Sequence, residues 1–269
     1  MAEDRAKDSE FLRGTELLAR EYQIENELER VMDQLLASGN LGRRAPEVYQ
    51  ELGNGLSFLM QIASCQWGCK KRDHIRENLV RRLVNYSFGI LRLTRLGLYN
   101  KAVALLRAAA ELVNLIELLT IDQKALQQWL SLSAHDRWRD FRPAKVQERI
   151  AATGNPAILD RNIYAAMCEF GVHVTPESAS FSHQFDGRVH VGGEFSIPAL
   201  FLVLNELAIM LGGFLKIVGY FAEVPKEKLE LLANAGSRVE GTATAWLRII
   251  NYAERLHEPV VNNSDASPV

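Results

Sequence analysis

Residues 98–120 read LYNKAVALLRAAAELVNLIELLT, and apolar side chains recur there at alternating steps of four and three. This spacing lines up one face of an α-helix. The positions that carry it are Leu98, Ala102, Leu105, Ala109, Leu112, Ile116 and Leu119. The other positions are almost as apolar, and a helix that is apolar nearly all round lies inside a protein or a membrane. The stretch therefore predicts a buried central helix.

Arg107, Glu111 and Asn114 interrupt this apolar helix. Arg107 and Glu111 are four residues apart, so their side chains share a face, and Asn114 follows three residues later. Two interpretations stay open. The two charges offset each other's burial, since a buried pair is tolerated where a lone charge is costly. Alternatively, Arg107 holds an anion or acts in catalysis, with Glu111 fixing its orientation and Asn114 as polar support.

The composition is ordinary for a globular protein, with 269 residues, 48% hydrophobic and 24% charged. A net charge of −2 gives no global reason to expect nucleic acid as a partner. Three cysteines make no disulfide framework, and residues 1–10 lack the apolar core of a signal peptide. We therefore expect a cytoplasmic protein with reduced thiols and no cofactor.

The pattern along the chain predicts an all-α fold, a single multi-helix bundle of seven or eight helices. We expect an acidic N-terminal helix within 1–38, a helical bundle domain at 46–257 and a disordered tail at 258–269. One long irregular loop, at about 171–197, contains five glycines and prolines and three of the six histidines. A loop of this length in a helical domain is often functional or disordered.

The apolar stretch 197–221 is long enough to cross a bilayer, which takes about 20 residues. Asn205 and Glu206 lie near its middle, where a charge is costly, and no basic cluster or tryptophan belt flanks it. We therefore expect a buried helix and no membrane partner.

A basic helix is expected within residues 70–95, opposite in charge to the N-terminal helix. Its dense part is Lys70, Lys71, Arg72, Arg76, Arg81 and Arg82. Such a face can dock nucleic acid or another phosphate. More often such a run is a solvated face, or docks the acidic N-terminal helix of the same or a neighbouring chain. We favour this interpretation over phosphate docking, because no aromatic residues interleave at stacking spacing.

Arg107 and Glu111 form our candidate catalytic site together with His173, supported by Tyr164. Histidine exchanges protons near neutral pH, and arginine can hold a phosphate or a developing oxyanion. The site requires the loop after His173 to fold back onto the central helix. The alternative role of His173 is a hydrogen-bonded anchor that fixes the loop.

We expect no metal site. Cys65 and Cys69 are separated by three residues and lack a second pair, so we place them one turn apart on a helix. The only candidate metal cluster combines two histidines with three carboxylates: His183, His190, Glu177, Asp186 and Glu194. Their spacing matches no recognised ligand pattern.

A family resemblance rests on short motifs in the middle third of the chain. They are Gly97, Tyr99, Ala102, Leu106, Arg107 and Glu111, then Tyr164, His173, Thr175, Pro176 and Glu177. This pattern resembles the DUF5677-type family of uncharacterised helical bacterial proteins. The resemblance implies a helical fold and a shared polar cluster. Ribonucleases of the HEPN type are less similar, because no histidine here has an arginine four to six residues upstream.

No nucleophile elbow, phosphate-binding loop or dinucleotide fingerprint is present in the sequence. We therefore expect a protein that acts by self-association, as a homo-oligomer, or as a subunit of a bacterial defence or stress system. The alternative is a nuclease-like or other phosphoester-acting enzyme that uses the Arg107, Glu111 and His173 cluster.

Overall fold

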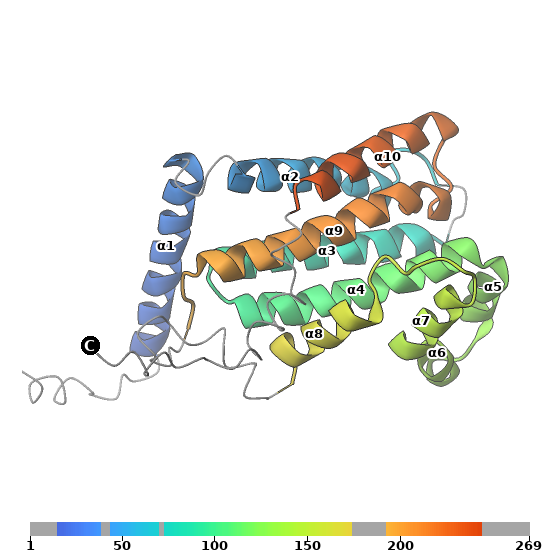
Figure 1. The fold of residues 1–269 in the computed structure, drawn as a ribbon, viewed down its shortest axis with the longest axis horizontal. Coiled ribbons are helices and arrows are strands. Elements are labelled where there is room, and N and C mark those ends of the chain that lie inside the picture. The colour runs from blue at the N-terminus through green and yellow to red at the C-terminus, as the bar shows by residue number, and fades with distance from the viewer. Residues whose placement is uncertain (1–14, 39–43, 70–72, 174–191, 244–269) are drawn as a thin grey trace, which may run out of the picture.

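Ten α-helices and no strands make up the described part of the chain in a computed structural model (Figure 1). The structure describes residues 15–38, 44–69, 73–173 and 192–243. The helices are α1 (Thr15–Ser38), α2 (Arg44–Ala63), α3 (Ile75–Arg95), α4 (Tyr99–Ile121), α5 (Gln123–Ser131), α6 (Ala134–Asp140), α7 (Pro143–Ala151), α8 (Arg161–Gly171), α9 (Ile197–Phe221) and α10 (Lys226–Gly241). The all-α prediction is confirmed, although the described residues form ten helices where seven or eight were expected.

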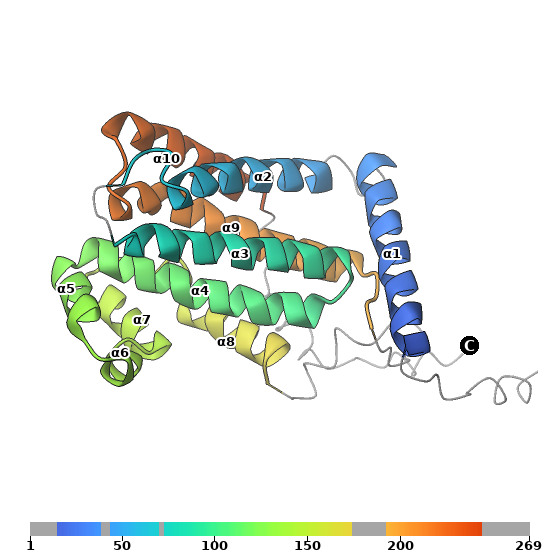
Figure 2. The same cartoon turned by 180° about the vertical axis from the view of Figure 1, so that it is seen from behind.

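Helix α4 lies at the centre, with α3, α8 and α9 packed along it (Figures 1 and 2). Val103, Leu106, Val113 and Ile116 are completely buried, as the apolar pattern of 98–120 predicts. Thirteen of the 23 residues of α4 are buried. The buried central helix is therefore confirmed.

Helix α9 is the second core helix and contacts α4, α2, α3 and α10. Its start is set by Ser196, whose hydroxyl accepts a hydrogen bond from the Ala199 N–H at 3.4 Å, and by Pro198 in the first turn. By length and hydropathy alone α9 qualifies as a membrane span. Its most apolar window is, however, 72% buried by the other helices, as is typical of a core helix.

A tight turn at Gly97 joins α3 to α4. Its φ of +68° lies in the left-handed region that favours glycine. A Cβ atom there would also lie 2.2 Å from the carbonyl oxygen of Glu194. The Glu194 N–H donates to the Gly97 carbonyl, and the Ser196 N–H donates to the Tyr99 hydroxyl at 3.2 Å. The chain that leads into α9 is therefore held against the α3–α4 turn.

Capping residues divide residues 122–151 into three short helices at one end of the molecule. Asp122 accepts hydrogen bonds from the N–H groups of Lys124 and Ala125, and Ser133 accepts one from Asp136. Pro143 opens α7, where its missing N–H costs nothing. These caps account for part of the difference between the ten helices of the described residues and the seven or eight expected.

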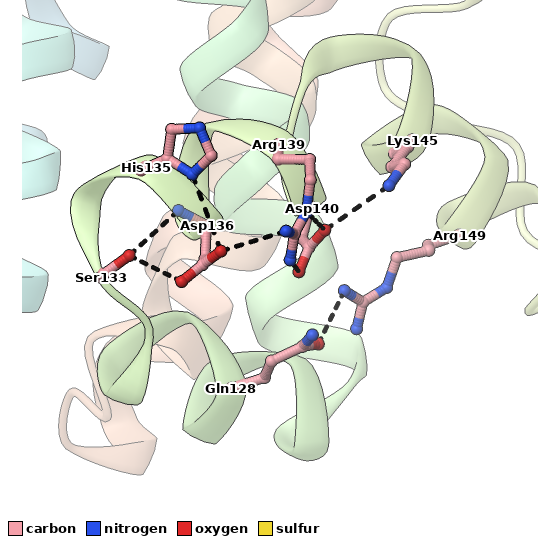
Figure 3. A network of polar contacts seen from close by, with 8 residues as sticks. All are labelled: Gln128, Ser133, His135, Asp136, Arg139, Asp140, Lys145 and Arg149. Carbon is pink, nitrogen blue, oxygen red and sulfur yellow. Dashed lines mark hydrogen bonds and ion pairs between the residues drawn. The ribbon is translucent and has the colours of Figure 1, made fainter.

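Exposed charges surround these caps (Figure 3). The Ser133 hydroxyl also donates to Asp136 at 2.7 Å, and Arg139 pairs with Asp136 at 3.2 Å and Asp140 at 2.9 Å. The Ser133 hydrogen bond and the Arg139 charge lower the pKa of Asp136. Because Arg139 is 55% exposed, such pairs contribute little to stability, and the network serves mainly to fix helix ends.

Helix α1 stands across the opposite end of the molecule (Figures 1 and 2). Glu29 pairs with Arg92 of α3, and Asp33 pairs with Arg95 at 2.7 Å. Met32, between these acids, is 1% exposed. The basic helix therefore docks the acidic helix, as one of our interpretations predicts, and among the described residues Arg92 and Arg95 make the ion pairs.

Candidate functional site

Arg107 and Glu111 lie on the edge of α4 that is not covered by the core. Their side chains are 30% and 32% exposed, and Arg107 Nη2 lies 2.8 Å from Glu111 Oε1. The spacing of four residues places them one helical turn apart. They form the ion pair that the sequence suggests.

Tyr164 of α8 completes this cluster. Arg107 donates from Nε and Nη2 to the Tyr164 hydroxyl at 3.2 and 2.9 Å, and that hydroxyl donates to Glu111 Oε1 at 2.8 Å. The Arg107 guanidinium also lies 5.4 Å from the centre of the tyrosine ring. Three side chains from two helices thus form hydrogen bonds and an ion pair with one another. We call Arg107, Glu111 and Tyr164 the Arg107 cluster.

Local sequence explains why α8 reaches α4 here. Asp160 caps α8 by accepting from the N–H groups of Asn162 and Ile163. At the other end, a Cβ atom on Gly171 would lie 2.6 Å from the Ala104 backbone nitrogen. Only glycine permits this close approach, so α8 packs tightly beside α4 and brings Tyr164 into reach of Arg107.

The electrostatics of the Arg107 cluster keep Tyr164 protonated. Burial raises the pKa of Tyr164 to about 12, Arg107 opposes this, and the Glu111 carboxylate reinforces it. Burial disfavours the charge of Arg107, but the hydrogen bond to Tyr164 and the charge of Glu111 outweigh it and raise the pKa of Arg107. At neutral pH the tyrosine is therefore a hydrogen-bond donor to Glu111, and the arginine is fully charged.

Asn114 lies outside the Arg107 cluster. Its side-chain amide donates to the Leu159 carbonyl at 3.0 Å and accepts from the Leu159 N–H at 3.3 Å. One turn further along α4, Glu117 accepts from the Ile158 N–H at 2.9 Å. These two residues fix the segment before α8, so Asn114 supports Tyr164 through the backbone rather than by contact.

His173 follows the end of α8 and is exposed. Its backbone N–H donates to the Cys168 carbonyl at 2.8 Å. Within the described ranges its side chain forms no hydrogen bond or ion pair with Arg107 or Glu111. The loop that was expected to fold back, including Thr175, Pro176 and Glu177, lies in residues 174–191 and hence outside the described residues.

The structure describes three of the six residues in the dense part of the basic face: Arg76, Arg81 and Arg82. Lys70, Lys71 and Arg72 lie outside the described residues. Arg76 pairs with Glu223 and stacks over the Phe221 ring at 5.7 Å. Arg82 donates to the Tyr86 hydroxyl at 2.7 Å. Exposed Arg81 lines an open groove of about 480 Å³ between α2 and α3, together with Met60, Val84 and Phe88.

The candidate metal cluster around His183 and His190 falls outside the described residues, apart from Glu194. The prediction that it is the only candidate is wrong. The structure brings Cys65, Cys69, His74 and Glu77 together at the turn between α2 and α3. This group is not apparent in the sequence, because Cys65 and Cys69 lack a second cysteine pair. The prediction that the two cysteines lie one turn apart on a helix is wrong, because α2 ends at Ala63.

Comparison with known proteins adds no relative, since no family model matches the chain and no curated protein or solved structure is significantly similar to it.

The pKa of Tyr164, and that of Tyr99, which burial also raises to about 12, predict a loss of stability in alkali. Both values lie above the ordinary 10.0, so the folded protein holds these protons more tightly than the unfolded chain. The resulting stabilisation is complete below pH 10 and is lost as the pH rises towards 12. Urea unfolding across this range should show the loss, and Tyr164→Phe should reduce it. An unchanged pH dependence in the variant would contradict the raised pKa of Tyr164.

Proposed function

We propose that this protein acts by association, joining a second copy of itself or another protein subunit through α1. The observation that carries the proposal is the exposure of large apolar side chains on the N-terminal half of this helix. Leu17, Leu18 and Tyr22 are 46%, 60% and 65% exposed. Leu18 and Tyr22 are four residues apart and share a face.

The way in which α1 packs against the other helices supports this role. Its C-terminal half contacts the core through buried Met32 and through the ion pairs of Glu29 and Asp33 with α3. Across the described residues Met32 is its only buried side chain, although the helix spans 24 residues. The C-terminal half of α1 is packed against the core, and its N-terminal half exposes apolar side chains to solvent. Such apolar patches commonly mark protein interfaces, so this half of α1 is suited to bind another protein.

Light scattering coupled to size-exclusion chromatography tests the proposal. We expect the full chain to elute as a dimer or larger oligomer, or to retain a protein partner in a pull-down. The variant Leu18→Glu should weaken association at least about tenfold, because burying one leucine contributes about 1.5–3 kcal/mol and about 1.4 kcal/mol corresponds to a factor of ten. Tyr22→Glu should act in the same direction.

Leu231→Glu is the matched control, because Leu231 is 38% exposed but lies on α10. It should leave the oligomeric state unchanged. Circular dichroism should show the same melting temperature for all three variants, which separates lost association from lost folding. A monomer at every concentration and salt strength, with no partner retained, would refute the proposal, as would equal effects of Leu18→Glu and Leu231→Glu.

We place this activity in the cytoplasm, within a bacterial defence or stress system. In this proposal residues 46–257 form a single bundle domain, and α1 precedes that domain in the chain. We also propose kinship with DUF5677-type proteins, on the sequence resemblance. Three of the residues that carry it, Arg107, Glu111 and Tyr164, contact one another.

A second candidate function is supported by one observation: the Arg107 cluster is partly exposed. A charged arginine beside a carboxylate suits phosphoester chemistry, with Arg81 and Arg82 as docking cations and His173 as the proton-transfer group. The direct experiment is incubation of the purified protein with RNA and DNA. Cleavage should disappear in Arg107→Gln and His173→Ala. No cleavage by the wild-type chain, or equal cleavage by the variants, would end this candidate.

A further inference from the structure

The turn between α2 and α3 gathers four side chains that are outside the Arg107 cluster and α1. Cys65 and Cys69 follow the end of α2, His74 is the residue before α3, and Glu77 lies in the first turn of α3. One ligand atom from each lies within 4.8 Å of all the others. Cys65 Sγ and His74 Nδ1 are 3.4 Å apart.

These four groups are ligands that Zn²⁺ prefers. Zinc binds cysteine thiolates at about 2.3 Å and histidine nitrogen at about 2.0–2.1 Å in a tetrahedron, which places two sulfur ligands about 3.8 Å apart. A group of donor atoms within 4.8 Å of one another needs only a small contraction to reach this geometry. Two soft sulfurs, an imidazole and a carboxylate also exclude the oxygen-loving Mg²⁺ and Ca²⁺.

The local backbone is shaped around this group. Cys65 and His74 have φ values of 60° and 50°, in the left-handed region that non-glycine residues rarely adopt. His74 occupies the N-cap position of α3, yet its side chain makes no capping hydrogen bond. Its Nδ1 atom lies at Cys65 instead. The two unusual conformations thus aim the thiol and the imidazole at one point.

Glu77 supplies a second, independent observation. The residue is only 7% exposed, and a carboxylate buried to this degree needs a positive partner. In the described part of the chain no ion pair is formed by Glu77, and the adjacent Arg76 pairs with Glu223. A divalent cation held among the four side chains would supply this positive partner.

We propose that Cys65, Cys69, His74 and Glu77 bind one Zn²⁺ ion that ties the end of α2 to the start of α3. With four protein ligands the site is structural, because catalytic zinc sites keep one position open for water. Binding displaces the protons of the two thiols, and no redox step takes place.

Metal analysis of the full-length chain, purified under reducing conditions and incubated with Zn²⁺, tests the site. We expect one Zn²⁺ per chain. Replacement by Co²⁺ should produce intense visible bands of a tetrahedral ion and a thiolate charge-transfer band in the near ultraviolet. The double variant Cys65→Ser, Cys69→Ser should lose both bands and weaken zinc binding more than about 100-fold, since even the loss of a ligand's supporting partner costs about 10–100-fold.

Cys168→Ser is the matched control, because Cys168 is the remaining free cysteine and lies on α8. It should bind Zn²⁺ like the wild type. If the double variant folds poorly, Glu77→Gln and His74→Ala give the same test through altered cobalt spectra. Absence of stoichiometric zinc, an octahedral cobalt spectrum, or equal zinc binding by the double variant and the wild type would overturn the proposal. None of these outcomes depends on the oligomeric state of the chain.

Discussion

Phe214→Ala is expected to lower the free energy of unfolding by about 3–5 kcal/mol. Phe214 is fully buried on α9, the core helix that packs against α4, α2 and α10. Truncation removes the apolar contacts of the ring and leaves a cavity that tightly packed helices fill only partly. Urea unfolding followed by circular dichroism measures this loss.

Phe88→Ala is the control, because Phe88 is 46% exposed on α3. Its loss of stability should be within about 1 kcal/mol, since exposed positions away from special features change stability little. Similar effects at Phe214 and Phe88 would mean that α9 is not a core helix.

Gly236→Ala is expected to destabilise the protein by about 1–3 kcal/mol, the range typical of overpacking. Gly236 lies where α10 crosses α9, and a Cβ atom there would lie 2.5 Å from the carbonyl oxygen of Gly212. The obstacle is backbone, so the two helices must separate. Thermal unfolding should show a clear fall in melting temperature.

Gly53→Ala makes the same chemical change in α2 with the opposite expected sign. A Cβ atom at Gly53 meets nothing within 4 Å, so only the gain in helix propensity remains, about 0.5–1 kcal/mol. Gly53→Ala should therefore raise the melting temperature while Gly236→Ala lowers it. Stabilisation by both variants would contradict the close crossing of α9 and α10.

The long helices were predictable because their apolar patterns are strong and their boundaries carry local signals. Residues 98–120 and 197–221 correspond to α4 and α9, which begin after Gly97 and Ser196. The three short helices of residues 122–151 were harder to separate, since their limits depend on caps such as Asp122 and Ser133. The spacing of apolar residues does not reveal individual capping hydrogen bonds, so the limits of these short helices could not be predicted from it.

The candidate site was predictable to the extent that it follows helical spacing. Arg107 and Glu111 pair because they are four residues apart, and Tyr164 was named with them. Asn114 forms a hydrogen bond with the Leu159 backbone and does not join the Arg107 cluster. This contact could not be predicted from helical spacing, because it depends on where α8 packs. Cys65, Cys69, His74 and Glu77 meet only because the chain reverses between α2 and α3. The reversal depends on left-handed conformations at Cys65 and His74 that their residue types do not favour.

Hydrogen–deuterium exchange tests most directly whether α4 is the buried centre of the molecule. Amides of residues 102–119 should be among the slowest to exchange, with opening free energies close to that of global unfolding. Amides of residues 15–25 in exposed α1 should exchange much faster and provide the internal reference. Exchange in 102–119 as fast as in α1 would contradict the central position of α4 and the placement of the Arg107 cluster on its edge.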